Sequence, residues 1–226
     1  MSICKNKKIN IITIFDKEYP EKLKKIYDKP LYLYTKGNTE LLNNNNIAVI
    51  GARNCSEYGK NIAKDISYNL SKYNICIVSG LAKGIDTFAH IGALGATGKT
   101  IGVLGNGIDN IYPSQNKVLA DKIIENNGLL ISEYIVGTKA EKMNFPERNR
   151  IISGISDGIV VVEAAEKSGA LITADFGLEQ GKEIYAVPGN INSEYSIGTN
   201  KLIKDGANII TSYKDILYNC YKIYNI

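Results

Sequence analysis

Arginine is rare in this chain and is confined to two short segments. Of its 27 lysine and arginine residues only three are arginines, Arg53, Arg148 and Arg150. The planar guanidinium group can bind a phosphate through two parallel hydrogen bonds, whereas lysine offers one flexible charge. The arginines therefore indicate a phosphate-binding site formed by the two segments, and a chance distribution of so few residues is the alternative interpretation.

The first arginine lies in a turn that is suited to anions. The apolar run Ile47–Ile50 predicts a buried strand, and Ser56 marks the start of a helix. Between them lie Gly51, Arg53 and Asn54. Glycine lets backbone N–H groups approach a ligand closely, and the N-terminus of a helix favours negative charge. The turn therefore fits an anion site, although an ordinary strand–helix turn explains it equally well.

A second turn offers backbone donors and a positive charge. In the segment Ser79–Asp86 two glycines, Gly80 and Gly84, surround Lys83 at the end of a predicted strand. Such a loop can present N–H groups and one ammonium group to a phosphate. We expect Asp86 to cap the following helix, which is a structural role.

The segment from residue 142 to residue 150 has the chemistry of single-strand recognition. The ring of Phe145 can stack on any base, while Lys142 and the two arginines that flank Asn149 neutralise the backbone. These arginines lie two residues apart in a predicted helix, so their sides differ, and a structural role for one of them stays open. In the alternative interpretation Phe145 fills the core and the arginines form a solvated face.

A third polar turn follows the strand predicted at 158–162. Ser168 and Gly169 open a helix that also carries Thr173, so neutral donors again lie at a helix N-terminus. Glu163, at the strand end, is expected to fix the loop by accepting hydrogen bonds, because no second carboxylate or histidine is matched to it. This turn is therefore expected to bind rather than to catalyse.

The single histidine and the four cysteines give little sign of catalysis. His90 falls within a predicted helix without a nearby acid or cysteine, and we expect it to be packed or on the surface. The cysteines lack the close pairing of a zinc site, so we expect reduced thiols and no metal. Only Cys55, beside Arg53 near a helix start, has surroundings that would lower the pKa of a thiol.

Seven short apolar runs, separated by amphipathic stretches, set the fold class. The predicted strands are 47–50, 75–78, 100–104, 129–132, 158–162, 184–187 and 208–210. The predicted helices lie near 57–72, 85–96, 114–126, 146–155, 170–181, 198–204 and 212–222. This alternation is typical of an α/β protein with a mainly parallel sheet that is covered on both faces. Ligands of such sheets bind at the carboxyl ends of the strands, where the polar turns lie.

Composition bounds the remaining possibilities. We expect residues 1–46 to form a small N-terminal appendage and linker, and residues 47–226 to form the main domain with a C-terminal helix. The net charge of +4 permits an anionic partner without requiring one. No apolar run approaches the length of a membrane span, and no signal-peptide core follows the lysine-rich N-terminus. We therefore expect a cytoplasmic protein that does not enter a membrane.

Taken together, the motifs resemble one family, the DNA-processing proteins called DprA or Smf. The resemblance rests on seven segments that occur in the order and at the spacing of that family, from about residue 10 to residue 216. They are Gly51-Ala-Arg-Asn54, Ser79-Gly-Leu-Ala-Lys-Gly-Ile-Asp86, Leu104-Gly-Asn-Gly107 with Tyr112-Pro113, Phe145-Pro-Glu-Arg-Asn-Arg-Ile-Ile-Ser-Gly154, Val161-Val-Glu-Ala164, Ser168-Gly-Ala-Leu-Ile-Thr-Ala174 and Ala186-Val-Pro-Gly189.

The resemblance implies an extended Rossmann-like domain that binds single-stranded DNA and forms homodimers. It also implies that the protein loads the RecA recombinase onto incoming DNA during natural transformation, without enzymatic turnover and without a cofactor. Compared with many members, we expect this sequence to lack the helical N-terminal module and the winged-helix C-terminal module, and we expect their absence to affect dimer strength and RecA contact more than DNA binding.

The resemblance also assigns roles to residues. By position, Arg53, Lys142 and Arg148 would hold phosphates, and Phe145 would lie against a base. The other DNA-binding positions that it implies are Gly51, Asn54, Gly80, Lys83, Gly84, Asn149, Arg150, Ser168, Gly169 and Thr173. The competing hypothesis is a Rossmann-like nucleotide sensor or phosphoribohydrolase, although the diglycine signature of that enzyme group is missing from Val162–Leu171.

Overall fold

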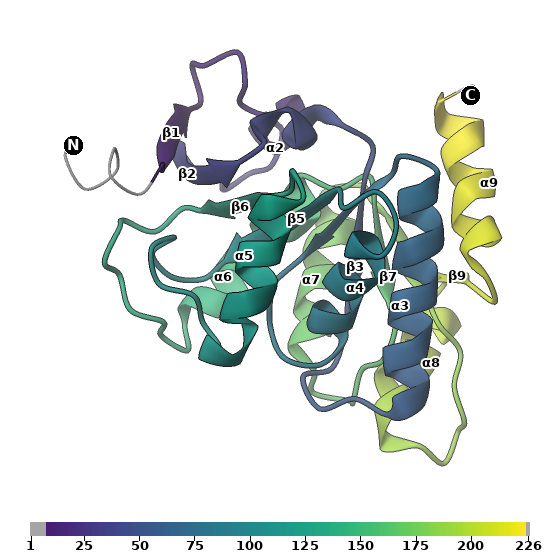
Figure 1. Cartoon of the computed structure of the whole chain (residues 1–226). Helices are drawn as coiled ribbons and strands as arrows, with labels where there is room; N and C mark the ends of the chain where they lie inside the picture. The colour runs from purple at the N-terminus through teal and green to yellow at the C-terminus, as the bar shows by residue number, and fades with distance from the viewer. Residues whose placement is uncertain (1–7, 225–226) are drawn as a thin grey trace.

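Seven parallel strands form the centre of the sheet in the computed structural model, which describes residues 8–224 and the side chains through residue 219. In chain order they are β3 (Asn46–Ile50), β4 (Cys76–Ser79), β5 (Thr100–Leu104), β6 (Leu129–Ser132), β7 (Gly158–Val161), β8 (Glu183–Ala186) and β9 (Asn208–Ile209). Each strand begins and ends within one residue of its prediction. The predicted α/β fold with a mainly parallel, Rossmann-like sheet is confirmed (Figure 1).

The order of these strands creates a crevice at one edge of the sheet. In space they run β6-β5-β4-β3-β7-β8-β9. The chain moves outward from β3 through β4 and β5 to β6, and then returns to place β7 on the other side of β3. The connections that leave β3 and β7 therefore diverge, and a ligand site is expected at the carboxyl ends of these two strands.

The N-terminal segment joins the same sheet. Strand β1 (Asn10–Thr13) pairs antiparallel with β2 (Tyr32–Gly37), and β2 pairs antiparallel with β6. Between and after these strands lie α2 (Glu21–Lys24) and the short 3-10 helix η1 (Thr39–Asn43). Leu23 and Leu42 are fully buried in the core beneath the parallel strands. The division of the chain at residue 46 stays a prediction, since the described residues of both parts share one sheet and one core.

Helices cover both faces of the sheet (Figure 1). One face carries α3 (Glu57–Lys72), α4 (Ile85–Leu94), α5 (Lys117–Glu125) with its leading turn η2 (Ser114–Asn116), and α9 (Tyr213–Tyr224). The other face carries α6 (Asn144–Gly154) and α7 (Gly169–Glu179), and α8 (Ile197–Lys204) follows the turn η3 (Glu194–Ser196) near β8. Strand β3 is buried on both sides, because Ile47 and Val49 pack toward α3 while Ala48 and Ile50 pack toward α6.

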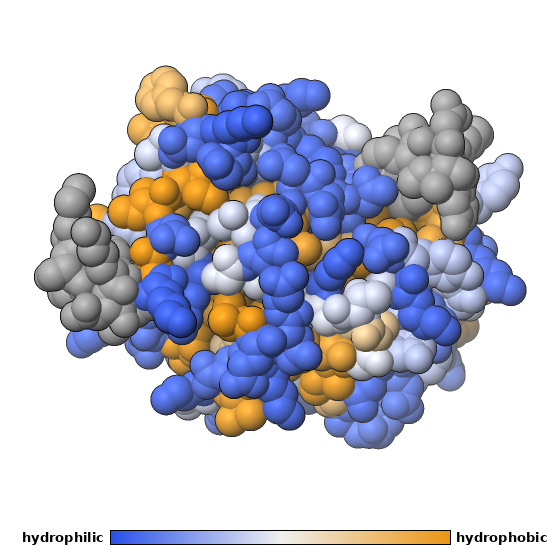
Figure 2. All heavy atoms as spheres, turned by 45° about the horizontal axis from the view of Figure 1, so that its top comes forward, coloured by the Kyte–Doolittle hydropathy of each residue, from blue (hydrophilic) through white to orange (hydrophobic). Residues whose placement is uncertain are grey.

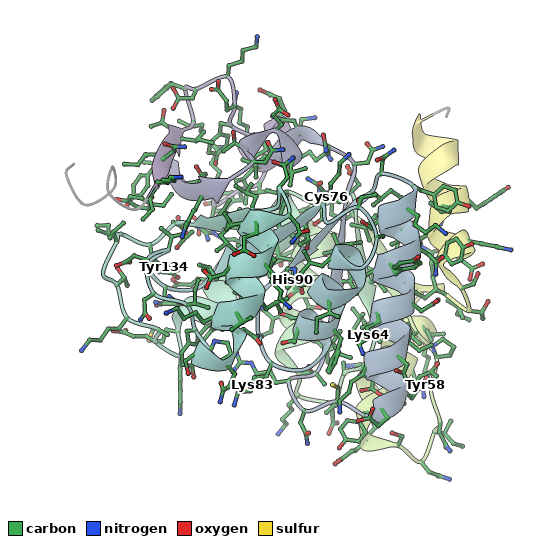
Figure 3. All side chains as sticks on the ribbon, viewed as in Figure 1. Tyr58, Lys64, Cys76, Lys83, His90 and Tyr134 are labelled. Atoms are coloured by element: carbon green, nitrogen blue, oxygen red, sulfur yellow. The ribbon has the colours of Figure 1, made fainter. Side chains whose placement is uncertain are left out.

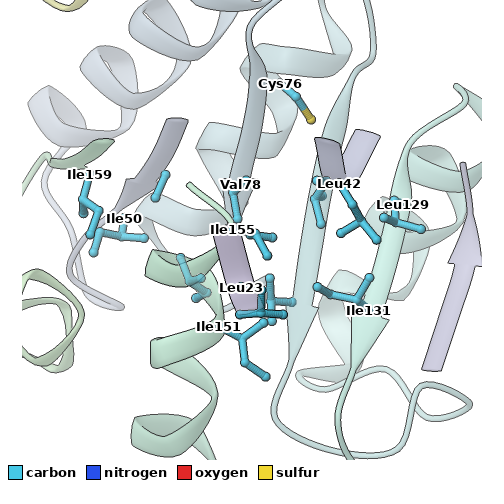
Figure 4. Packing of buried hydrophobic residues seen from close by; sticks show 14 of the residues in the cluster. Leu23, Leu42, Ile50, Cys76, Val78, Leu129, Ile131, Ile151, Ile155 and Ile159 are labelled. Atoms are coloured by element: carbon cyan, nitrogen blue, oxygen red, sulfur yellow. The ribbon is translucent and has the colours of Figure 1, made fainter. Parts of the chain in front are cut away.

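Helix α6 is fixed to the sheet by its isoleucines. Ile151 packs in one cluster with Ile50 and Val78 of the strands (Figure 4). At the end of the helix Gly154 lies against α2, where a methyl group would stand 2.6 Å from the Cδ1 atom of Leu23. Close packing on both sides therefore sets the rotation of α6 about its axis, and with it the direction of every polar side chain that the helix carries.

The face that carries the N-terminal segment is mostly hydrophilic, and its exposed apolar side chains form small separate groups (Figure 2). Within the N-terminal segment, the side chains of Phe15, Tyr27 and Leu31 are exposed. Within residues 8–224 no helix combines the length and the apolar composition that crossing a membrane would require.

Candidate functional site

A cleft of about 610 Å³ opens at the carboxyl ends of β3 and β7, where the strand order reverses. Its walls come from the turn after β3, the N-terminal half of α6 and the turn into α7. The predicted site residues that line it are Gly51, Arg53, Asn54, Lys142, Phe145, Arg148, Asn149, Ser168, Gly169 and Thr173. The fold therefore brings together three segments that lie far apart in the sequence.

Phe145 stands in the first turn of α6 and faces this cleft. The side chain of the preceding Asn144 donates a hydrogen bond to the carbonyl oxygen of Gly105 at 3.0 Å, which ties the helix start to the end of β5. A methyl group on Gly105 would stand 2.9 Å from the Cδ1 atom of Phe145, so the ring lies directly on this glycine. The ring is nevertheless only partly buried, and its centroid lies 5.7 Å from that of Tyr112.

Arg53 is exposed and lies over the ring of Phe145, with its guanidinium carbon 5.1 Å from the ring centroid. The turn that carries it is fixed by backbone hydrogen bonds, because Ala52 donates to the carbonyl of Glu163 at 2.8 Å and accepts from Ile85 at 3.2 Å. Gly84, with φ of +76°, packs its Cα against the carbonyls of Ala52 and Arg53, where a side chain would collide. Gly84 therefore supports the turn and does not line the cleft.

Arg148 is buried and shapes the wall of the cleft. It is 3% exposed, and its Nη1 atom donates to the carbonyl oxygen of Gly80 at 2.7 Å and to that of Val103. The N–H group of Gly80 in turn donates to the Oδ2 atom of Asp86 at 3.0 Å. A guanidinium and a carboxylate thus hold the same peptide segment from two sides.

The charge states of this pair follow from burial. Burial lowers the pKa of Arg148 to about 10, against the effect of the nearby Asp86 carboxylate, so the guanidinium stays charged at neutral pH. Burial likewise raises the pKa of Asp86, against the effect of Arg148. The prediction that Asp86 caps α4 is wrong, because the N-cap residue is Gly84 and the carboxylate binds the loop before the helix.

Arg150 is directed away from the cleft. Its Nη2 atom lies 2.8 Å from the Oε1 atom of Glu133, and its Nε atom lies 3.0 Å from a carboxylate oxygen of Asp28. Its Nη1 atom donates to the carbonyl oxygen of Glu147 at 3.0 Å. These contacts tie α6 to the N-terminal segment, and the predicted contact of Arg150 with DNA stays a prediction without support from its position.

Gly80 and Lys83 line a smaller pocket of about 60 Å³ beside the cleft. The two cavities share Arg53, Phe145 and Arg148 as a common wall. Lys83 is exposed and lies beyond the carboxyl end of β4, whereas Cys76 begins that strand at its other end (Figure 3). The predicted second turn therefore borders the same site.

The N-terminus of α7 forms the facing wall. Ser168 is its N-cap residue and accepts a hydrogen bond from the N–H group of Ala170 at 3.3 Å. The amide of Asn149 donates to the carbonyl oxygen of Gly169 at 3.2 Å, which joins α6 to α7 across the cleft. Thr173 is 2% exposed, and its hydroxyl lies 3.5 Å from the same carbonyl. These neutral groups hold the wall in place.

Two cleft residues whose side chains are suited to binding a nucleic acid were missed as site residues from the sequence. Lys167 is an exposed lysine in the turn before α7, and Tyr112 is 49% exposed beside Phe145. The segment Tyr112-Pro113 was a signal that could have found the second. With Lys167 included, the charged side chains that line the cleft are four cations and the single buried carboxylate of Asp86. The cleft is therefore suited to an anion.

The groups weighed for acid–base or thiol chemistry are occupied by structural contacts. Glu163 accepts hydrogen bonds from the backbone and the hydroxyl of Ser56, so the prediction that it fixes a loop is confirmed. His90 is buried with its Nδ1 atom 2.7 Å from the hydroxyl of Thr100, and burial lowers its pKa to about 3, so it is a packed neutral histidine.

Cys55 departs from its prediction. Burial and the carboxylate of Glu163 raise the pKa of this thiol, so the lowered value expected near Arg53 is wrong. Cys76 is a buried free thiol, whereas Cys4 and the side chain of Cys220 lie outside the described part of the chain. Within that described part, no three histidine, cysteine or acidic residues are placed to hold a metal ion.

Comparison with known proteins identifies the family. The family model for DNA recombination-mediator protein A matches residues 10–221. The chain belongs to this family. A relative in it, the DNA processing protein DprA of Bacillus subtilis, is 46% identical over 209 residues, which cover 92% of this chain and 70% of the relative.

Solved structures of this family agree with the fold. The structure of DNA processing protein A from Streptococcus pneumoniae has a TM-score of 0.88 at 41% identity and covers 96% of this chain and 77% of its own. A structure that describes the single-stranded DNA binding mode of DNA processing protein A from Helicobacter pylori has a TM-score of 0.85 at 30% identity, with coverages of 95% and 96%. The resemblance to the DprA and Smf proteins is confirmed.

Proposed function

We propose that the cleft binds single-stranded DNA. The observation that carries this proposal is the partly exposed ring of Phe145, which lies in a cationic cleft with the guanidinium of Arg53 5.1 Å from its centroid. Single strands are bound by this combination, because an aromatic ring stacks on the face of any base while cations neutralise the backbone. A duplex keeps its base faces covered and offers such a ring nothing to stack on.

The distribution of charge supports the same ligand. Arg53, Lys142 and Lys167 are exposed on three different segments around the opening, whereas the Asp86 carboxylate lies beneath the surface. A strand that passes through the cleft would therefore meet positive charge on each side. The family relative from Helicobacter pylori, whose structure describes single-stranded DNA binding, covers 95% of this chain and supports the proposal independently.

We further propose that binding serves the loading of the RecA recombinase onto incoming DNA in natural transformation or recombination, by a cytoplasmic homodimer and without turnover. The family resemblance supports this role. Binding without catalysis agrees with the structural engagement of Glu163 and His90. Faster assembly of RecA on protected single strands in the presence of the protein is the expected result of a filament-assembly assay, and an unchanged rate would contradict the loading role.

The binding proposal is tested by fluorescence anisotropy with labelled single-stranded and duplex oligonucleotides at two salt concentrations. We expect wild type to prefer the single strand, and Arg53→Ala to bind about tenfold more weakly or worse, since a charge-assisted contact contributes about 1.5–3 kcal/mol. Lys72→Ala is the matched control, because Lys72 is an exposed cation at the far end of α3. Equal affinity of wild type and folded Arg53→Ala would contradict the proposal.

A folded wild-type protein that binds no single strand would favour the small-ligand hypothesis. In that case a screen of mononucleotides and cyclic nucleotides by thermal shift would test the Rossmann-like sensor or phosphoribohydrolase that the sequence left open.

A further inference from the structure

Tyr112 forms a second aromatic surface beside Phe145. Its side chain is 49% exposed, and it lines both the cleft and the smaller pocket. The two ring centroids are 5.7 Å apart and the ring planes are tilted by 33°. This is the separation of aromatic rings in direct contact, so no base fits between them. A base can therefore reach Tyr112 only over the exposed part of its ring.

The loop that carries Tyr112 is held from within. Asn106 is fully buried, and its amide donates to the carbonyl oxygens of Gly107, at 3.1 Å, and of Asn110. The hydroxyl of Ser132 donates to the carbonyl oxygen of Asn106 at 2.7 Å. A half-exposed ring on a rigid support loses little conformational entropy when a flat ligand covers it. The loop that leads to Tyr112 is therefore held in place before any ligand arrives.

We propose that Tyr112 is a second base-stacking residue, so that two consecutive nucleobases of a bound strand lie one on Phe145 and the next on Tyr112. This inference rests on the proposed binding of single-stranded DNA. The exposed guanidinium of Arg53 lies over the ring of Phe145, so it turns aside when a base stacks there, and it can then bind the phosphate beside that base. Recognition through base faces tolerates any sequence, and it requires two adjacent bases that are unstacked from each other.

Tryptophan fluorescence gives a direct test, because the chain contains no tryptophan. Tyr112→Trp places a single reporter in the cleft. Tyr73→Trp is a closely matched control, since Tyr73 is 50% exposed and its ring contacts that of Tyr213 at 6.1 Å with a tilt of 31°. Tyr73 follows the last residue of the 16-residue helix α3, whose N-terminus lies at the cleft, so it is about 24 Å away from that end.

A thymidine hexanucleotide is the probe, titrated into each single-tryptophan protein while binding is followed in parallel by anisotropy. We expect the tryptophan at position 112 to be quenched on binding and the tryptophan at position 73 to be unchanged. We also expect Tyr112→Ala to weaken binding about fivefold or more, since stacking contributes about 1–3 kcal/mol per base. Tyr112→Phe keeps the ring and should bind as wild type does.

The results separate this inference from the proposal beneath it. Binding of the hexanucleotide without quenching at position 112, together with wild-type affinity of Tyr112→Ala, would overturn the second stacking residue and leave single-strand binding intact. Failure of the folded wild type to bind the hexanucleotide would overturn both. Two adjacent abasic positions in the probe should reproduce the loss caused by Tyr112→Ala and Phe145→Ala combined, and an unaffected affinity would also count against stacking.

Discussion

Helix α6 lies between two groups of cations that meet very different surroundings. On the side of the N-terminal segment Arg150 is paired with Glu133 and Asp28, and nearby Lys22 lies 2.6 Å from a carboxylate oxygen of Asp157. The exposed cations that line the cleft itself are Arg53, Lys142 and Lys167, and none of them takes part in an ion pair among residues 8–219.

The difference separates charges that hold the protein together from charges that are offered to a ligand. In a partly buried ion pair the two charges neutralise each other, and removal of one partner leaves the other charge partly desolvated and unpaired. An exposed cation beside an open cavity changes the stability of the free protein little, because it stays solvated. It contributes to the free energy of binding when it contacts a phosphate. Arg148 belongs to both classes, since it lines the cleft while its hydrogen bonds fix Gly80 and Val103.

The largest expected effect is on stability and comes from Arg148. We expect Arg148→Ala to lower the free energy of unfolding by about 3–5 kcal/mol, because it removes the donor for two buried carbonyls and leaves Asp86 without its counter-charge. Urea denaturation followed by circular dichroism measures this. If Arg148→Ala keeps wild-type stability and loses only DNA affinity, Arg148 belongs with the ligand-binding cations and the comparison fails at this point.

Phe145→Ala should instead reduce affinity for single-stranded DNA by about 1–3 kcal/mol, the contribution of one stacked base. The ring is only partly buried, so the melting temperature should change little. Anisotropy and a thermal melt on the same sample give both values. A variant that unfolds while Arg53→Ala stays folded and binds normally would show that Phe145 is a core residue.

Arg150→Ala should behave in the opposite way to Phe145→Ala. We expect a loss of about 1–2 kcal/mol in the free energy of unfolding, because Glu133 and the N-terminal segment lose their partner. Affinity for DNA should stay within about twofold of wild type, a difference below 1 kcal/mol. Arg150→Lys retains the charge without the planar donor group, so its free energy of unfolding should lie between those of wild type and Arg150→Ala. A large loss of affinity at unchanged stability would place Arg150 among the ligand-binding residues after all.

The smallest expected effect is that of Lys167→Ala. One exposed lysine near the strand should alter affinity by less than about 1 kcal/mol, but the slope of log affinity against log salt should fall by about 0.7 for one lost phosphate contact. Lys72→Ala should leave the slope unchanged. Identical slopes for wild type and Lys167→Ala would remove Lys167 from the set of cations that contact the strand.

Most of the sheet could be predicted because its strands are buried on both faces. Continuous apolar runs such as Ile47–Ile50 and Gly158–Val162 stand out between polar turns, and their spacing leaves room for one helix each. The pairing of β2 with β6 could not be predicted in this way. It joins Gly37 to Leu129 across a long stretch of chain, and nothing in either segment specifies the partner.

For the site, the sequence predicted which residues are present more reliably than the directions in which their side chains point. Because Arg148 and Arg150 lie two residues apart on a helix, they had to point to different sides. Which of the two faces the cleft depends on how Ile151 and Gly154 pack. The role of Asp86 and the raised pKa of Cys55 were missed for a similar reason. Both depend on a neighbour distant in sequence: Arg148, which holds the same Gly80 segment as Asp86, and Glu163, which lies near Cys55.

The double hold on Gly80 also bears on how fast a ligand can bind. In the free protein Arg148 already donates a hydrogen bond to the carbonyl oxygen of Gly80, and Asp86 already accepts one from its N–H group. The wall of the cleft formed by Arg148 therefore needs no rearrangement when a ligand binds. Immobilising a long side chain at an interface costs about 0.5–1.5 kcal/mol, and for Arg148 that cost is met during folding. Only the exposed cations remain to be ordered, so we expect association to follow a single kinetic phase without a slow closing step.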